Sequence, residues 1–142
     1  MTLIAAVVFA VLSGIALLHA AWAFGVHWPA HDEQSLINRV IGKRGMTEMP
    51  GIGLTLLVVI GIASGGVCAL WGARLVSLPL PEWLSSLSIV VLAIIFGLRG
   101  VASYLPGPLS SSVEPFATLD RHYYAPLCLA LCCGYLFIYH GR

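Results

Sequence analysis

Two side chains that can carry charge or transfer a proton lie inside otherwise apolar stretches of this sequence. Arg99 is the one charged residue within residues 84–105, and His19 is the one histidine well inside such a stretch. A charge inside a bilayer is costly and marks a functional site by default, so Arg99 is the first candidate. His19 is suited to ligand contact or proton transfer. Two structural alternatives stay open, namely that Arg99 snorkels to the interface and that His19 only packs.

The polar and aromatic residues that flank the apolar stretches complete a candidate site. If the stretches are membrane spans, the end of the first, the start of the second, the end of the third and the start of the fourth share one membrane face. The predicted ligand-binding residues are His19, Trp22, Glu48, Arg99, Tyr104, Asp120, Arg121 and Tyr123. Arg99 then pairs with Glu48, with Asp120 or with a bound anion. Asp120 also stands where a helix N-cap is wanted, so capping is an alternative to a catalytic role.

Motifs for established catalytic and cofactor chemistry are missing from the sequence. It has no C-x-x-C, E-x-x-H, G-x-S-x-G or P-loop motif. His122 and His140 fall near opposite ends of the fourth stretch, which disfavours a bis-histidine haem. Cys128 and Cys132 share a helix face, but buried cysteines behave mostly as small apolar residues. We therefore expect no cofactor and no metal site, and the sequence leans away from an enzyme.

The composition restricts where these residues can lie. The chain has 142 residues, of which 59% are hydrophobic and 9% charged, with a net charge of +1. A soluble domain is about 45–50% apolar and about 25% charged. This composition excludes a water-soluble enzyme, a disordered chain and a nucleic-acid binder, which needs a basic surface. An integral membrane protein remains, with the lipid bilayer as its surroundings.

Four apolar stretches divide the chain. Residues 3–24, 51–73 and 123–139 contain no Asp, Glu, Lys or Arg, and residues 84–105 contain only Arg99. A helix of 22 residues is about 33 Å long and crosses a hydrocarbon core of about 30 Å. We predict an all-α, polytopic membrane protein, a four-helix transmembrane bundle that forms one domain over residues 1–142. A signal peptide is the alternative for the first stretch, but no Lys or Arg precedes it, so we expect a span.

The first connection, loop 1 (residues 25–50), is expected to contain a short interfacial helix. Leu36, Ile37, Val40 and Ile41 recur at helical spacing. Asp32 can cap the start of this helix, and Gly42 can end it. Either the membrane surface or the bundle itself can accept its apolar face.

The basic residues favour one orientation. Loop 1 and loop 3 (residues 106–122) hold Arg39, Lys43, Arg44 and Arg121, whereas the opposite side holds Arg74 and Arg142. The positive-inside rule therefore favours loops 1 and 3 in the cytoplasm.

Two further patterns concern the packing of the helices and the membrane interfaces. Small residues recur four apart in every stretch and predict close helix approach, among them Gly14, Gly61, Gly65, Gly97 and Gly134. Aromatic residues fall towards both expected interfaces, and the set opposite loops 1 and 3 is Trp71, Trp83, Tyr135 and Tyr139.

Several of these residues occur together in a known family. His19-Ala-Ala-Trp22, Arg99 and the segment from Phe116 to Cys128 resemble a family of small bacterial four-span membrane proteins known as a domain of unknown function. The resemblance covers nearly the whole chain and implies a bacterial cytoplasmic membrane, but it implies no activity. It also implies that one set of positions acts together, namely Trp22, Arg99, Asp120, Pro126 and Cys128.

Four classes of function are left. The favoured class is the binding of an anionic or amphiphilic small molecule, or of a lipid, at the loop-1/loop-3 face. The main alternative is an accessory or assembly subunit, with a membrane-protein partner or a second copy of the chain. A membrane enzyme and a small dimeric transporter follow, because each candidate acid or base has a structural explanation and no span carries a central acid.

Overall fold

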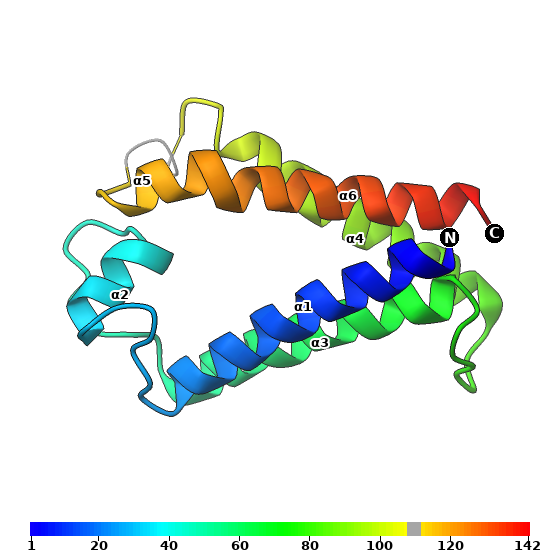
Figure 1. Cartoon of the computed structure of the whole chain (residues 1–142), viewed down its shortest axis with the longest axis horizontal. Coiled ribbons are helices and arrows are strands. Elements are labelled where there is room, and N and C mark those ends of the chain that lie inside the picture. The colour runs from blue at the N-terminus through cyan, green and yellow to red at the C-terminus, as the bar shows by residue number, and fades with distance from the viewer. Residues whose placement is uncertain (108–111) are drawn as a thin grey trace.

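The chain folds into four long helical segments, and a further short helix lies in the connection between the first two (Figure 1). This computed structural model describes residues 1–107 and 112–142, and no strand occurs among them. Its helices are α1 (Thr2–Ala23), α2 (Glu33–Val40), α3 (Ile52–Gly72), α4 (Glu82–Ala102), α5 (Phe116–Leu119), the π-helical turn η1 (Asp120–Tyr124) and α6 (Ala125–His140). The segments α1, α3, α4 and Phe116–His140 are each long and apolar enough to cross a membrane. The predicted all-α, four-span membrane protein is confirmed.

The first three spans fall within three residues of the predicted bounds, whereas the fourth is longer than predicted. It begins at Phe116 and not near residue 123, because α5, η1 and α6 run on as one continuous helical segment. The sequence analysis placed the start of this span after the charged residues Asp120 and Arg121. Asp120 lies inside the helical segment because its charge is paired there with Arg99.

The four spans form two pairs. Helix α1 packs along α3, and α4 packs along α6. Figure 1 shows the two pairs close together near the chain termini and further apart near α2. The hydrophobic core, which includes Leu12, Ala69, Ile89 and Leu131, lies towards the terminal end.

Tyr135 is the largest fully buried side chain of this core. Its hydroxyl donates a hydrogen bond of 2.8 Å to the carbonyl of Gly65, and its ring stacks on Phe96 with 5.8 Å between ring centroids. The prediction that Tyr135 belongs to an interfacial aromatic belt is therefore wrong. A buried tyrosine is tolerated here because its one polar atom has a partner.

Some of the predicted small-residue contacts are confirmed. A Cβ added to Gly65 would lie 3.3 Å from the Tyr135 hydroxyl, and one added to Gly134 would lie 2.9 Å from Val8. At Gly97 it would lie 3.2 Å from the sulfur of Cys132. Gly14 and Gly61 have no such neighbour within 4 Å, so those two are not contact positions in this chain.

Helix α2 occupies the position predicted for the short helix of loop 1. The carboxylate of Asp32 caps it by accepting the Ser35 N–H at 2.8 Å. Leu36 and Ile37 are fully buried, so its apolar face packs on protein. Gly42 ends it with a φ of +66°, and a side chain there would collide with the ring of Phe116.

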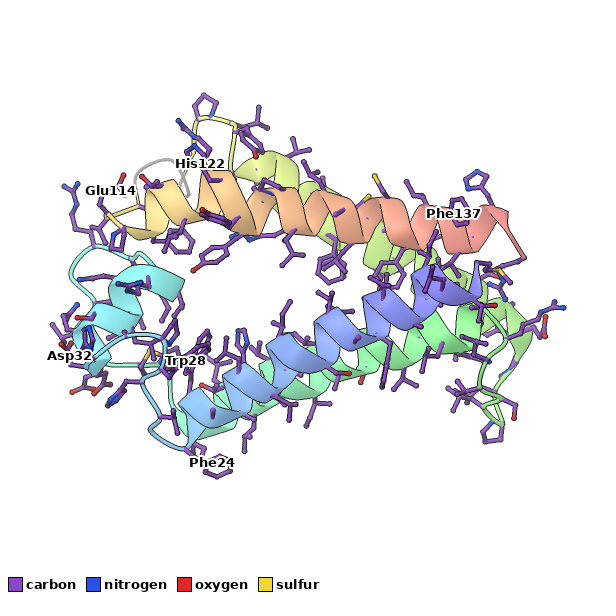
Figure 2. The ribbon with its side chains drawn as sticks, in the orientation of Figure 1. Phe24, Trp28, Asp32, Glu114, His122 and Phe137 are labelled. Atoms are coloured by element: carbon purple, nitrogen blue, oxygen red, sulfur yellow. The ribbon has the colours of Figure 1, made fainter. Side chains whose placement is uncertain are left out.

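Polar groups gather at the α2 end of the molecule. Figure 2 shows Asp32, Glu114 and His122 at this end, whereas Phe137 lies towards the chain termini. Large apolar side chains are exposed along the long helices, among them Leu17, Leu57, Leu98 and Phe137. Such exposure is expected of helices that face lipid.

Candidate functional site

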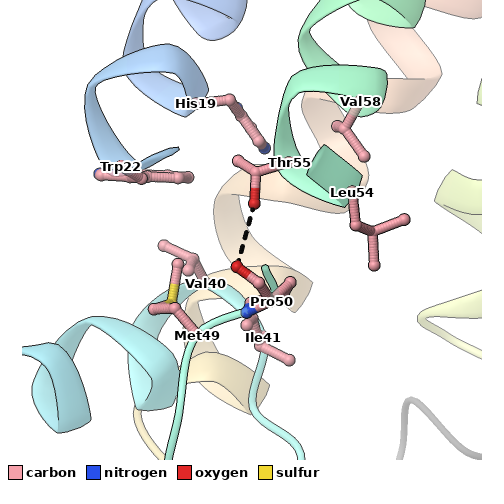
Figure 3. A pocket seen from close by; sticks show the side chains of 9 residues that line it. All are labelled: His19, Trp22, Val40, Ile41, Met49, Pro50, Leu54, Thr55 and Val58. Atoms are coloured by element: carbon pink, nitrogen blue, oxygen red, sulfur yellow. Dashed lines mark hydrogen bonds between the residues drawn. The ribbon is translucent and has the colours of Figure 1, made fainter. Parts of the chain in front are cut away.

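A cavity of about 250 Å³ lies at the α2 end, between α1, α2 and the start of α3 (Figure 3). We call it the α2 cavity. Most of its lining is apolar, and only His19, Trp22 and Thr55 carry N–H, O–H or nitrogen acceptor groups on their side chains. The full lining is His19, Trp22, Val40, Ile41, Met49, Pro50, Leu54, Thr55 and Val58.

His19 points into this cavity from α1 (Figure 3). Its Nδ1 lies 2.8 Å from the carbonyl oxygen of Ile15, one turn earlier. A carbonyl can only accept, so Nδ1 carries the hydrogen and, in the neutral ring, Nε2 is left as an acceptor. Within the described residues Nε2 has no hydrogen-bond partner. The ring also packs on Trp22, with 4.7 Å between the ring centroids.

Thr55 provides the second polar side chain from α3. Its hydroxyl lies 3.3 Å from the carbonyl of Pro50 and 3.3 Å from that of Gly51, and its proton is shared with these carbonyls. The residue is 6% exposed. The oxygen lone pairs of Thr55 remain able to accept a hydrogen bond. Sequence reasoning missed Thr55, although a hydroxyl one turn inside an apolar stretch was a usable signal.

Helix α2 closes one side of the cavity and is tied to the chain that enters α3. The carboxylate of Glu33 accepts the N–H of Met49 at 2.9 Å, and the amide of Gln34 donates to the Met46 carbonyl at 3.1 Å. On its other side, the hydroxyl of Tyr124 donates to the carbonyl of Arg39 at 3.1 Å. The helix therefore bridges the α1–α3 pair and the helical segment that begins at Phe116.

Arg99 and Asp120 form an ion pair between α4 and η1, with 2.5 Å between Nη2 and Oδ1. Nη1 of Arg99 also donates to the hydroxyl of Ser103 at 2.6 Å. The Asp120 side chain is 4% exposed and that of Arg99 is 33% exposed. Of the two side chains considered as partners for Arg99, Glu48 and Asp120, it is Asp120 that pairs with it. Asp120 does not cap a helix, because the helical segment begins before it at Phe116.

The π-helical turn next to this ion pair leaves one main-chain carbonyl that a side chain serves. The N–H of Ala125 donates to the carbonyl of Asp120, five residues earlier. The same register would pair the Arg121 carbonyl with residue 126, which is a proline and has no N–H. The hydroxyl of Tyr104 donates to this Arg121 carbonyl instead, at 2.8 Å. Tyr104 thereby stabilises the register in which Asp120 reaches Arg99.

The eight residues predicted to form one polar cluster fall into separate groups. His19 and Trp22 line the α2 cavity, and Trp22 donates its ring N–H to the carbonyl of Trp28 at 2.7 Å. The Arg99–Asp120 pair and the Tyr104–Arg121 contact lie on the other pair of spans. Glu48 and Tyr123 are exposed and, like Arg99, Tyr104, Asp120 and Arg121, are absent from the cavity lining.

No group of three or more His, Cys, Asp or Glu side chains in the described ranges is arranged to hold a metal ion. A second hollow of about 400 Å³ lies at the other end, next to Trp71. Of its charged residues, Arg74 and Glu82 pair with each other, with side chains 65% and 76% exposed, and Arg142 donates to the hydroxyl of Ser86 at 2.9 Å. None of the predicted site residues lines that hollow.

A family model described as "protein of unknown function (DUF3995)" matches residues 12–135. The chain belongs to this family. The match runs from the middle of α1 into α6, so it includes the whole lining of the α2 cavity and the Arg99–Asp120 pair. No curated protein and no solved structure matches the chain.

Proposed function

We propose that this protein binds an amphiphilic small molecule, or a lipid, at the loop-1/loop-3 face, with the apolar part of the ligand in the α2 cavity. The α2 cavity is the observation that supports this function. Small-molecule sites are concave and mostly apolar, contain a few polar groups that set orientation, and typically measure about 300–1,000 Å³. The α2 cavity has this chemistry, and its volume of about 250 Å³ is slightly below that range.

The position of the cavity favours a ligand from the membrane over one from water. Its walls come from the ends of two spans and from a helix whose buried face packs on the bundle. Arg99 is paired with Asp120 and does not line the cavity, so its charge is already matched within the protein. An amphiphile is therefore favoured over a small anion. We further propose that loops 1 and 3 face the cytoplasm, because they hold more Lys and Arg than the opposite side. The family resemblance supports a bacterial cytoplasmic membrane.

Fluorescence of Trp22 tests this function because its ring lines the cavity. A variant that retains Trp22 and carries Trp28→Phe, Trp71→Phe and Trp83→Phe is placed in phosphatidylcholine nanodiscs with a brominated long-chain alcohol. Binding in the α2 cavity predicts quenching that saturates. The control variant retains only Trp83, which is 65% exposed and far from the cavity, and here quenching rises in proportion to the probe. Equal, unsaturated curves for both variants would refute the proposed function.

A further inference from the structure

The side-chain donors of the α2 cavity are already engaged within the protein. The ring N–H of Trp22 is directed at the carbonyl of Trp28, and the Thr55 proton is shared between two main-chain carbonyls. The other lining side chains have no N–H or O–H group apart from His19, whose Nδ1–H is bonded to Ile15. A ligand that needs a side-chain donor would therefore find none in the lining.

Acceptors, in contrast, are available. Nε2 of His19 has no partner in the described part of the chain and points into the cavity (Figure 3). The lining contains no Lys and no Arg, so a buried anionic head group would have no counter-charge from a side chain. A group that donates one hydrogen bond and carries no charge matches this set of atoms.

Building on the proposed function, we infer that the ligand of the α2 cavity is a long-chain or isoprenoid molecule with a neutral hydroxyl group that donates to Nε2 of His19. The Ile15 carbonyl holds the ring so that this acceptor faces the cavity, and contact with Trp22 limits its rotation. The apolar chain of the ligand then packs along Val58, Leu54 and Val40.

A matched series of probes separates the hydroxyl from the chain. Dodecan-1-ol, its methyl ether and dodecyl phosphate are titrated into nanodiscs that hold the variant that retains Trp22, and binding is measured by competition with the brominated alcohol that quenches Trp22. One hydrogen bond contributes about 1 kcal/mol, so the alcohol should bind about fivefold more tightly than the ether. The phosphate should bind more weakly than the alcohol.

His19→Asn isolates the acceptor. The asparagine amide can still donate to the Ile15 carbonyl, but it has no atom at the position of Nε2. The affinity for the alcohol should fall to that for the ether. His122→Asn is the control, because Nδ1 of His122 makes the same type of contact with Thr118, at 2.9 Å, outside the cavity. It should leave the fivefold preference unchanged.

Each result has a defined meaning. An ether that binds as well as the alcohol, or a preference that survives His19→Asn, overturns the hydroxyl inference and leaves the cavity function in place. If dodecyl phosphate binds more tightly than the alcohol, the hydroxyl inference is overturned, and the ligand is instead an anion held by the uncapped N-terminus of α3. If no probe gives saturable binding, the proposed function itself fails. Should His19→Asn not fold, the ¹⁵N resonance of His19 Nε2 in the unaltered protein decides, because it must shift with the alcohol and not with the ether.

Discussion

Arg99 and Asp120 neutralise each other between α4 and η1, where the Asp120 side chain is 4% exposed. This pairing lets a carboxylate lie within the fourth helical segment and explains why that segment begins at Phe116. The two residues come from spans that pack together along their length, so the pair also fixes their relative register.

Arg99→Leu should destabilise the protein strongly, because it leaves the Asp120 carboxylate buried without a counter-charge. A loss of about 3 kcal/mol in the free energy of unfolding is expected, and the double variant Arg99→Leu/Asp120→Leu should recover most of it. Reversible unfolding in bicelles measures both values. Arg74→Leu is the control, because its exposed pair with Glu82 should contribute less than about 1 kcal/mol. A double variant no more stable than Arg99→Leu would show that the uncompensated charge is not the cause.

Tyr104→Phe should cost about 1 kcal/mol, since it leaves the Arg121 carbonyl without its donor. In a Pro126→Ala background residue 126 regains an N–H that can serve this carbonyl, so Tyr104→Phe should then cost close to nothing. The four proteins of this double-mutant cycle are compared by the same unfolding measurement. Additive effects would contradict the account of the π-helical turn.

Tyr135→Phe should destabilise the core by about 1 kcal/mol, because it removes the buried hydrogen bond from the Tyr135 hydroxyl to the Gly65 carbonyl and changes nothing else in shape. Tyr139→Phe is the matched control on the same helix, where the side chain is 43% exposed, and it should have little effect. Equal stabilities of the two variants would argue against the buried hydrogen bond.

Titration of Asp32 should reveal how α2 is capped. The Ser35 main-chain N–H and then its hydroxyl hold the pKa of the Asp32 carboxyl below its ordinary value of 3.8. A lowered pKa in the folded state means that the cap stabilises α2 above the unfolded pKa and is lost as the pH falls through the folded pKa. The amide proton shift of Ser35 should follow this titration with a midpoint below 3.8. Asp32→Asn should abolish it, and a midpoint at or above 3.8 would contradict the capping.

The sequence was sufficient for elements whose signals are local. Long apolar stretches with at most one charged residue located the first three spans, and Asp32 with Gly42 located α2. The fourth span was misjudged because its polar start depends on a partner from another helix, which no local pattern encodes. Tyr135 was misplaced for a similar reason, since its partner is the Gly65 carbonyl seventy positions away.

The candidate site was only partly predictable. His19 and Trp22 were correctly expected at one end of the bundle, because membrane topology fixes depth. Topology does not fix which way each helix faces, so it could not separate this pair from Arg99 and Asp120 at similar depth. The part that α2 plays in closing the cavity depends on its packing against two distant segments.

Native mass spectrometry of the protein released gently from its own membrane tests the central claim most directly. The α2 cavity predicts a discrete added mass of small-molecule size on the unaltered protein. Val58→Trp, which fills the cavity, should remove it, whereas Leu57→Trp on the neighbouring exposed position should retain it. An added mass that persists in Val58→Trp would contradict binding in this cavity. A protein partner in fixed ratio with no small-molecule mass would indicate an accessory subunit instead.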